Sequence, residues 1–271
     1  MEFNWIFHIT SLVLAGVASG FIAGLFGVGG GIVRIPIFLF LFPLFGIRQE
    51  ILMHMAAGTS LTLAIPSAVM ASRAQYRAGN LDLKFLKNWI PPLVGGVIIG
   101  LIVMRYASSV LLEQVFAFMM LVISAQMFFT GNDFKIVEHA SRWLIHGVAP
   151  LFIGTLSTML GLTGGSFTTP VLTSFGYPIH RSIAVATAGG FFISLIGALG
   201  SAINGLGVPG RAEYALGFID LTALVFMAPA IMLMAPWGVK LANSLSQKRL
   251  RKIFSIFLFL VALDMLRSLY L

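Results

Sequence analysis

The chain of 271 residues contains no cysteine, and only 10% of its residues are charged. The absence of cysteine excludes disulfides, thiolate metal sites and cysteine nucleophiles. A soluble domain carries about 25% charged residues, so this chain has too few to cover a surface that faces water. Hydrophobic residues make up 58% of the sequence, and the mean hydropathy is +0.98. We therefore expect an all-α integral membrane protein whose main solvent is lipid.

Acidic residues are scarcer than basic ones, which gives a formal net charge of +8 at pH 7. The Lys and Arg residues stand in short loops between apolar runs, where the cytoplasmic bias of basic residues explains them. We therefore expect membrane lipids and a small substrate as partners, and no nucleic acid. The basic cluster at 248–252 is expected to bind anionic headgroups. A homo-oligomer stays possible, because the sequence does not define the oligomeric state.

Apolar segments follow one another along the whole chain, and the first has no basic region of the kind that precedes a cleaved signal peptide. Segments two and seven are short and contain proline, and the seventh, at about 13 residues, makes a helix of only about 20 Å. A polar break at 131–135 divides an N-terminal repeat, residues 1–133, from a C-terminal repeat, residues 134–271. The ten segments lie at about 5–26, 31–46, 50–72, 85–104, 109–130, 141–161, 164–176, 181–204, 218–239 and 253–270.

A glycine-rich motif occurs twice, at 27–36 (GVGGGIVRIP) and at 161–170 (GLTGGSFTTP), each time between two apolar segments. At an offset of 134 residues, three glycines and a proline coincide in the two copies. Duplicated breaks in a membrane chain are the best sequence indication of a transport site near the bilayer midplane. Close packing of helices through small residues is the alternative role of such glycines.

The number of basic residues on each side of the segments indicates how the chain crosses the membrane. If all ten segments cross, one side holds twelve Lys and Arg residues and the other holds four, with Arg34 inside the second segment. If segments two and seven return without crossing, each side holds eight. The positive-inside rule therefore favours ten crossings with both termini outside. Five crossings per half make two inverted five-segment repeats, as in many secondary transporters.

The glycine motifs also suggest what the protein binds. Glycine runs leave backbone N–H groups uncovered, and a helix that begins there has unpaired N–H groups and a partial positive end. Two such helix starts that face each other form a site for one small oxyanion. The predicted substrate-binding residues within the two motifs, apart from Arg34, are Gly27, Gly29, Gly30, Gly31, Gly161, Thr163, Gly164, Gly165 and Ser166.

Other polar residues can complete this anion site. Arg34 suits an oxyanion through its planar guanidinium, or it extends to the membrane interface from near a helix end. Thr59, Ser60 and Thr187 occupy matched places in segments three and eight. These hydroxyls either complete the anion cage or bond back to their own helices.

These motifs resemble those of the TauE/SafE family of bacterial membrane proteins, which are known as sulfite exporters or probable membrane transporters. The resemblance rests on the run from Gly24 to Gly31 with Pro36, on the Ala-Gly-Thr-Ser run at 57–60, and on the weaker second copy that ends in Pro170. It implies a multi-pass protein of the bacterial inner membrane. It also implies secondary transport of sulfite, sulfonates or related organic anions by alternating access, without a cofactor.

Two other functions remain as alternatives. An anion channel would share the same site, and sequence does not separate a channel from a carrier. A membrane-embedded serine hydrolase would need a base beside Ser166, and the nearest histidine in sequence, His180, has no fixed relation to it. We therefore expect a transporter and not an enzyme.

Overall fold

The computed structural model describes residues 5–26, 30–129, 141, 143–244 and 247–270. The described part of the first half contains α1 (Trp5–Phe26), α2 (Gly31–Leu44), a 3-10 turn (Gln49–Ile51), α3 (Leu52–Arg77), α4 (Leu83–Tyr106) and α5 (Ser109–Phe129). The described part of the second half contains a π-helical turn (Leu144–Val148), α6 (Ala149–Met159), α7 (Gly165–Ser174), α8 (Ile179–Asn204), β1 (Ala215–Leu216), β2 (Ile219–Asp220), α9 (Leu221–Ser244) and α10 (Gln247–Tyr270).

The ten predicted segments are all helices in the structure, with ends that differ by a few residues. Helix α3, for example, continues to Arg77, past the apolar run that ended the predicted segment at 72, and the Arg side chains of this extension are exposed. The antiparallel β1–β2 hairpin was not predicted. Six described spans are long and apolar enough to cross a bilayer, and α2 and the Leu144–Met159 run are apolar but shorter. The protein is therefore a multi-pass, essentially all-α membrane protein.

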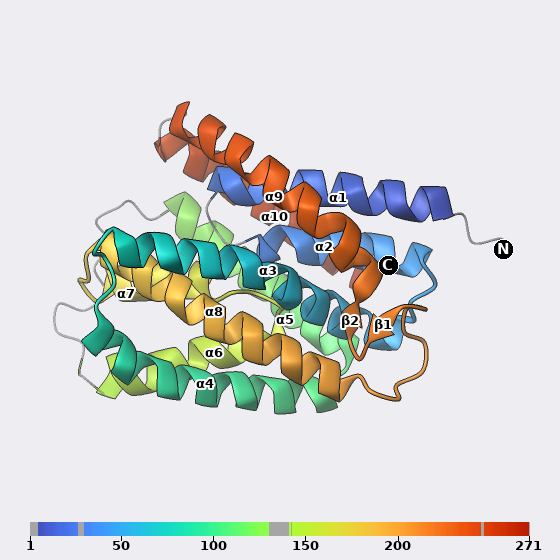
Figure 1. Ribbon diagram of the computed structural model, residues 1–271, viewed down its shortest axis with the longest axis horizontal. Helices are drawn as coiled ribbons and strands as arrows, with labels where there is room; N and C mark the ends of the chain where they lie inside the picture. Colours follow the sequence, from blue (N-terminus) through green and yellow to red (C-terminus); the bar gives the residue numbers. More distant parts are fainter. Residues whose placement is uncertain (1–4, 27–29, 130–140, 142, 245–246, 271) are drawn as a thin grey trace.

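Helices α3 and α8 lie side by side through the middle of the molecule, with α1 and α9 on one side and α4 and α6 on the other (Figure 1). Helices α3 and α8 are antiparallel, because Gly58 lies against Ser201 and Leu61 lies against Gly197. Small residues bring the helix pairs close together. A Cβ atom on Gly20, for example, would lie 2.7 Å from the backbone of Ile231 in α9.

The β1–β2 hairpin marks one end of the molecule, which we call the hairpin end. Trp5 at the start of α1 lies 5.8 Å from Tyr214, ring centre to ring centre, and the backbone N–H of Met53 at the start of α3 donates to Ser109 Oγ at 2.7 Å. We call the opposite end the basic end. It contains the last turn of α3 and the first turns of α4 and α8, with exposed Arg73 and Arg77. Helices α1 and α10 begin and end, respectively, at the hairpin end (Figure 1).

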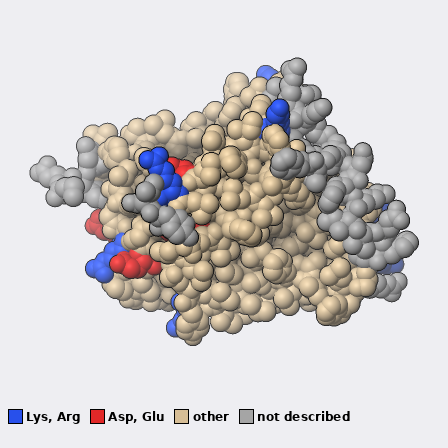
Figure 2. Space-filling view, turned by 180° about the vertical axis from the view of Figure 1, so that it is seen from behind, with Lys and Arg blue, Asp and Glu red and all other residues tan. Residues whose placement is uncertain are grey.

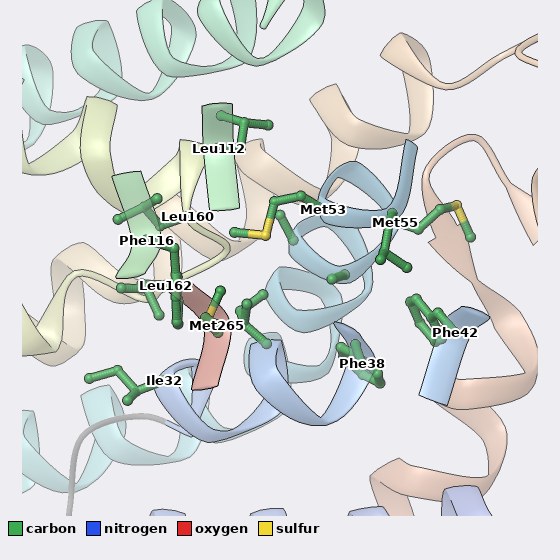
Figure 3. Close-up of a cluster of buried hydrophobic side chains, with 14 of the residues drawn as sticks. Ile32, Phe38, Phe42, Met53, Met55, Leu112, Phe116, Leu160, Leu162 and Met265 are labelled. Atoms are coloured by element: carbon green, nitrogen blue, oxygen red, sulfur yellow. The ribbon is translucent and has the colours of Figure 1, made fainter. Parts of the chain in front are cut away.

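Apolar side chains fill the spaces between the helices. One cluster joins α2, α3, α5 and α10 to the segment before α7, and it includes Phe38, Phe116 and Leu162, all at most 1% exposed (Figure 3). Figure 2 shows a broad face with few Lys, Arg, Asp or Glu side chains, and those that it shows lie mainly toward one end and along the upper edge. Large apolar residues such as Phe118 and Leu233 are exposed. A surface of this kind is stable in lipid.

Candidate functional site

The two glycine motifs adopt the same local conformation. Gly30, directly before α2, has φ 75° and ψ −18°, and Gly164, directly before α7, has φ 75° and ψ −13°. This left-handed conformation is one that glycine adopts without strain. The offset of 134 residues therefore relates two equal backbone breaks, each of which opens a short helix.

The two short helices also end in the same way. Gly46 and Gly176 have φ of 80° and 83°, and the N–H groups of Ile47 and Tyr177 donate to the carbonyls of Phe42 and Leu172. This is the hydrogen bond of a Schellman helix end. The signal in the sequence is the dipeptide Phe-Gly at 45–46 and 175–176, which lies outside the two glycine motifs and was not predicted.

The first break lies against the second. A Cβ atom on Gly31 would lie 2.9 Å from the carbonyl oxygen of Gly161. Ser60 in α3 donates a hydrogen bond from its Oγ to that same oxygen, at 2.8 Å. The structure therefore brings together three of the predicted residues, one from each motif and one from the central helix α3.

Helices α6 and α8 cover the second break on its other sides. A Cβ atom on Gly190 of α8 would lie 2.8 Å from the carbonyl oxygen of Thr163. Ser157 Oγ of α6 lies 3.3 Å from the corresponding position on Gly164, and this buried hydroxyl has no hydrogen-bond partner among the described residues. Thr163 and Ser166 are themselves buried, whereas Gly165 is half-buried. The second break is thus enclosed by protein on at least two sides.

The side chain of Arg34 points toward the start of its own helix, α2. Its guanidinium carbon lies 3.4 Å from where a Cβ atom on Gly30 would stand, and the residue is only 2% exposed. The side chain therefore lies over the first break and does not reach the surface of the described protein. This position adds a full positive charge to the partial positive end of α2.

The three predicted hydroxyl residues on α3 and α8, Thr59, Ser60 and Thr187, have different hydrogen-bond partners. Thr59 Oγ1 accepts a hydrogen bond from the backbone N–H of Asp220 at 3.0 Å, and Thr187 Oγ1 donates to Ala184 O of its own helix at 2.9 Å. Of the polar residues predicted on α3 and α8, only Ser60 bonds to a glycine break in the described structure. Gly27 and Gly29, also predicted as binding residues, lie outside the described residues.

The pair that a serine hydrolase would need is not brought together. Ser166 is buried near the start of α7, whereas His180 is exposed near the start of α8. No hydrogen bond joins the two side chains within the described part of the chain.

Comparison with known proteins gives the family. The family model described as Sulfite exporter TauE/SafE matches residues 12–265. A probable membrane transporter protein of Haemophilus influenzae is 27% identical over 254 residues, with 93% of this chain and 96% of the relative covered. A second, of Methanocaldococcus jannaschii, is 26% identical over 267 residues, with 98% of each chain covered. No solved structure matches the chain. The protein belongs to the TauE/SafE family of membrane transporters.

Proposed function

We propose that the protein is a secondary transporter of a small anion, such as sulfite, a sulfonate or a related organic anion, that works by alternating access. The observation that carries this proposal is the contact of two equal glycine breaks, with Arg34 over one of them. The substrate class follows the description of the family as sulfite exporters. The relatives, described as probable membrane transporters, support transport in general.

The starts of α2 and α7 supply the chemistry for an anion. In α2, the N–H groups of Val33 and Arg34 donate to Gly30 O, so those of Gly31 and Ile32 stand before the first bonds of the helix. In α7, the N–H groups of Phe167 and Thr168 donate to Gly164 O in the same way. N–H groups at such positions bind oxyanions in many proteins. Arg34 adds a charged donor that binds oxyanions more strongly than a neutral group does.

The arrangement of helices supports two inverted halves, residues 1–133 and 134–271. Helix α1 packs along α9 as α6 packs along α4, and α2 packs on α3 as α7 packs on α8. Helix α2 runs from the breaks to the hairpin end, where Phe45 stacks on His8 at 3.7 Å between ring centres. Helix α7 runs to the basic end, where Tyr177 lies 5.0 Å from Phe85. Halves of opposite direction around a shared site can rock to expose it to either side in turn.

The charge distribution supports an orientation. The exposed Lys84 and Lys87 of α4 lie at the basic end with Arg73 and Arg77, and basic residues favour the cytoplasmic side. We propose that the basic end faces the cytoplasm in the bacterial inner membrane and that both chain termini are outside.

Transport by the purified protein in liposomes tests the site. We expect Arg34→Ala and Gly30→Leu each to abolish uptake of radiolabelled sulfite, because the first removes the cation and the second fills the break. Arg105→Ala is the matched control, since Arg105 is exposed in the last turn of α4 and should leave uptake unchanged.

The two site variants must first insert and elute from size exclusion as the unaltered protein does. Normal uptake by both would reject the assignment of the site. Uptake that rises linearly with sulfite concentration, without saturation, would instead favour an anion channel at the same site.

A further inference from the structure

A pocket of about 300 Å³ opens between the last turns of α3 and the middle of α8, toward the basic end (left in Figure 1). Arg73, Tyr76 and Arg77 line it from α3, and Ala188, Phe191 and Phe192 line it from α8. The pocket is open to the surface along much of its extent, and its volume is at the lower end of the usual range for small-molecule sites, roughly 300–1,000 Å³. The pocket is separate from the contact between the glycine breaks described above.

The pocket combines two kinds of surface. Arg73 and Arg77 stand one helical turn apart on α3 and are both exposed, so their guanidinium groups can reach one anionic group. None of the described residues that line the pocket is acidic. Opposite them, the rings of Phe191 and Phe192 lie 5.4 Å apart at 73° to each other and are half-buried. The pocket therefore offers a charged rim for an acid group and an aromatic wall for an apolar body.

The pocket lies close to the second glycine break. Gly190, which precedes Phe191, packs against the carbonyl oxygen of Thr163. A ligand on the phenylalanine wall is thus separated from the second break by one helix, α8. This proximity links the pocket to the proposed transport site.

The hairpin end differs from the basic end at the related positions. An offset of 128 residues relates the sequence of α3 to that of α8. At this offset, Leu63 and Ala64 of α3 correspond to Phe191 and Phe192 of α8. Leu63 and Ala64 are both buried. Phe218 packs there between the two central helices, because its backbone contacts Gly58 of α3 and Gly205 of α8. The central helices are therefore covered at the hairpin end and leave a pocket at the basic end.

We propose that this pocket is a second binding site that recruits organic anions from the basic side, with the acid group between Arg73 and Arg77 and the apolar body against Phe191 and Phe192. The recruiting role rests on the proposed transport function, whereas the binding itself does not. The favoured substrates are then sulfonates or carboxylates with a small apolar body, which fill the pocket better than bare sulfite does.

Binding of benzenesulfonate to the purified protein in phosphatidylcholine nanodiscs tests the proposal. We expect it to bind more tightly than methanesulfonate, which lacks the ring. The double variant Arg73→Ala/Arg77→Ala should weaken benzenesulfonate binding about tenfold or more, equivalent to about 1.4 kcal/mol. The matched control Lys84→Ala/Lys87→Ala removes the same charge from the same end outside the pocket and should bind as the unaltered protein does. Equal affinity in the two double variants, or equal affinity for both sulfonates, would overturn the site.

Two further experiments distinguish a lipid headgroup from a free organic anion as the ligand, and failure of the pocket from failure of the transport site. Competition by phosphatidylglycerol in the nanodisc that disappears in Arg73→Ala/Arg77→Ala would assign the pocket to a lipid headgroup and overturn the recruiting role. In liposomes, that variant should raise the KM for benzenesulfonate and leave the maximal rate unchanged. An unchanged KM would also overturn the recruiting role. Arg34→Ala should abolish transport but keep benzenesulfonate binding, so failure of the transport site is distinguishable from failure of the pocket.

Discussion

Ser60 in α3 donates its hydroxyl to the carbonyl oxygen of Gly161, 2.8 Å away. This bond joins the central helix to the second glycine break at the point where the first break also packs, through Gly31. A carbonyl in a glycine break has no helical partner, and leaving a buried one unsatisfied costs free energy. Ser60 therefore supports the shape of the proposed site.

Ser60→Ala is expected to lower the free energy of unfolding by roughly 0.6 kcal/mol, the average for hydrogen bonds between membrane helices, and by at most about 1.7 kcal/mol. It should also slow sulfite transport. Thermal unfolding in detergent and uptake in liposomes measure the two effects. The control is Ser67→Ala, whose hydroxyl bonds only to Ala64 of its own helix and should change neither quantity appreciably. Equal effects of the two substitutions would show that the bond to Gly161 has no special role.

Gly31→Ala tests the contact between the two breaks. Gly31 is helical, so alanine is not strained there, but its Cβ atom would lie 2.9 Å from Gly161 O and 3.0 Å from Leu162 Cδ2. Overpacking of this kind costs about 1–3 kcal/mol, and the breaks would have to separate. We expect a lower unfolding temperature and loss of uptake.

The matched control for Gly31→Ala is Gly95→Ala in α4, where the added Cβ meets no described atom within 4 Å apart from its chain neighbours and its own helix backbone. Alanine stabilises a helix interior by up to about 1 kcal/mol relative to glycine, so the control should unfold at the same or a higher temperature. A Gly31→Ala protein that is as stable and as active as this control would contradict the close contact.

Thr59→Val separates a structural from a binding role of this threonine. The substitution removes the acceptor for the buried N–H of Asp220, so we expect a loss of about 1–3 kcal/mol in the free energy of unfolding. The KM for sulfite should stay the same, because the hydroxyl is bonded to Asp220 in β2 and not to a glycine break. A raised KM at unchanged stability would instead show that Thr59 binds the anion, as the sequence predicted.

The absence of cysteine makes topology easy to measure, since any introduced cysteine is the only thiol. Glu213 at the hairpin end and Lys84 at the basic end are both exposed. In intact cells, Glu213→Cys should react with a membrane-impermeant maleimide, and Lys84→Cys should react only after permeabilisation. Reaction of both cysteines from the same side would contradict ten crossings, and the reverse pattern would contradict the orientation.

The sequence predicts the helices of this fold well, because long apolar runs and glycine breaks are local signals. The same local geometry at Gly30 and Gly164 follows from the repeated motif, since few other residues adopt a positive φ. The β1–β2 hairpin was missed, because two strands of two residues each leave almost no pattern in the sequence.

The partners of the polar residues were harder to predict. Thr59 and Ser60 are neighbours in sequence, yet one bonds to Asp220 and the other to Gly161. Which way a hydroxyl points on a buried helix depends on how distant segments pack against it, and periodicity does not carry that information. The pocket at Arg73 and Phe191 likewise exists only because α3 and α8 are antiparallel.

The central claim is that the glycine breaks and Arg34 hold a small anion, and the most direct test is the unfolding temperature of the purified protein at increasing sulfite concentration. A ligand that binds only the folded state stabilises it by about 2.7 kcal/mol at a concentration one hundred times its Kd. We predict a concentration-dependent rise for the unaltered protein and for Lys84→Ala/Lys87→Ala, and no rise for Arg34→Ala. An equal rise in Arg34→Ala, or no rise in the unaltered protein, would contradict the account.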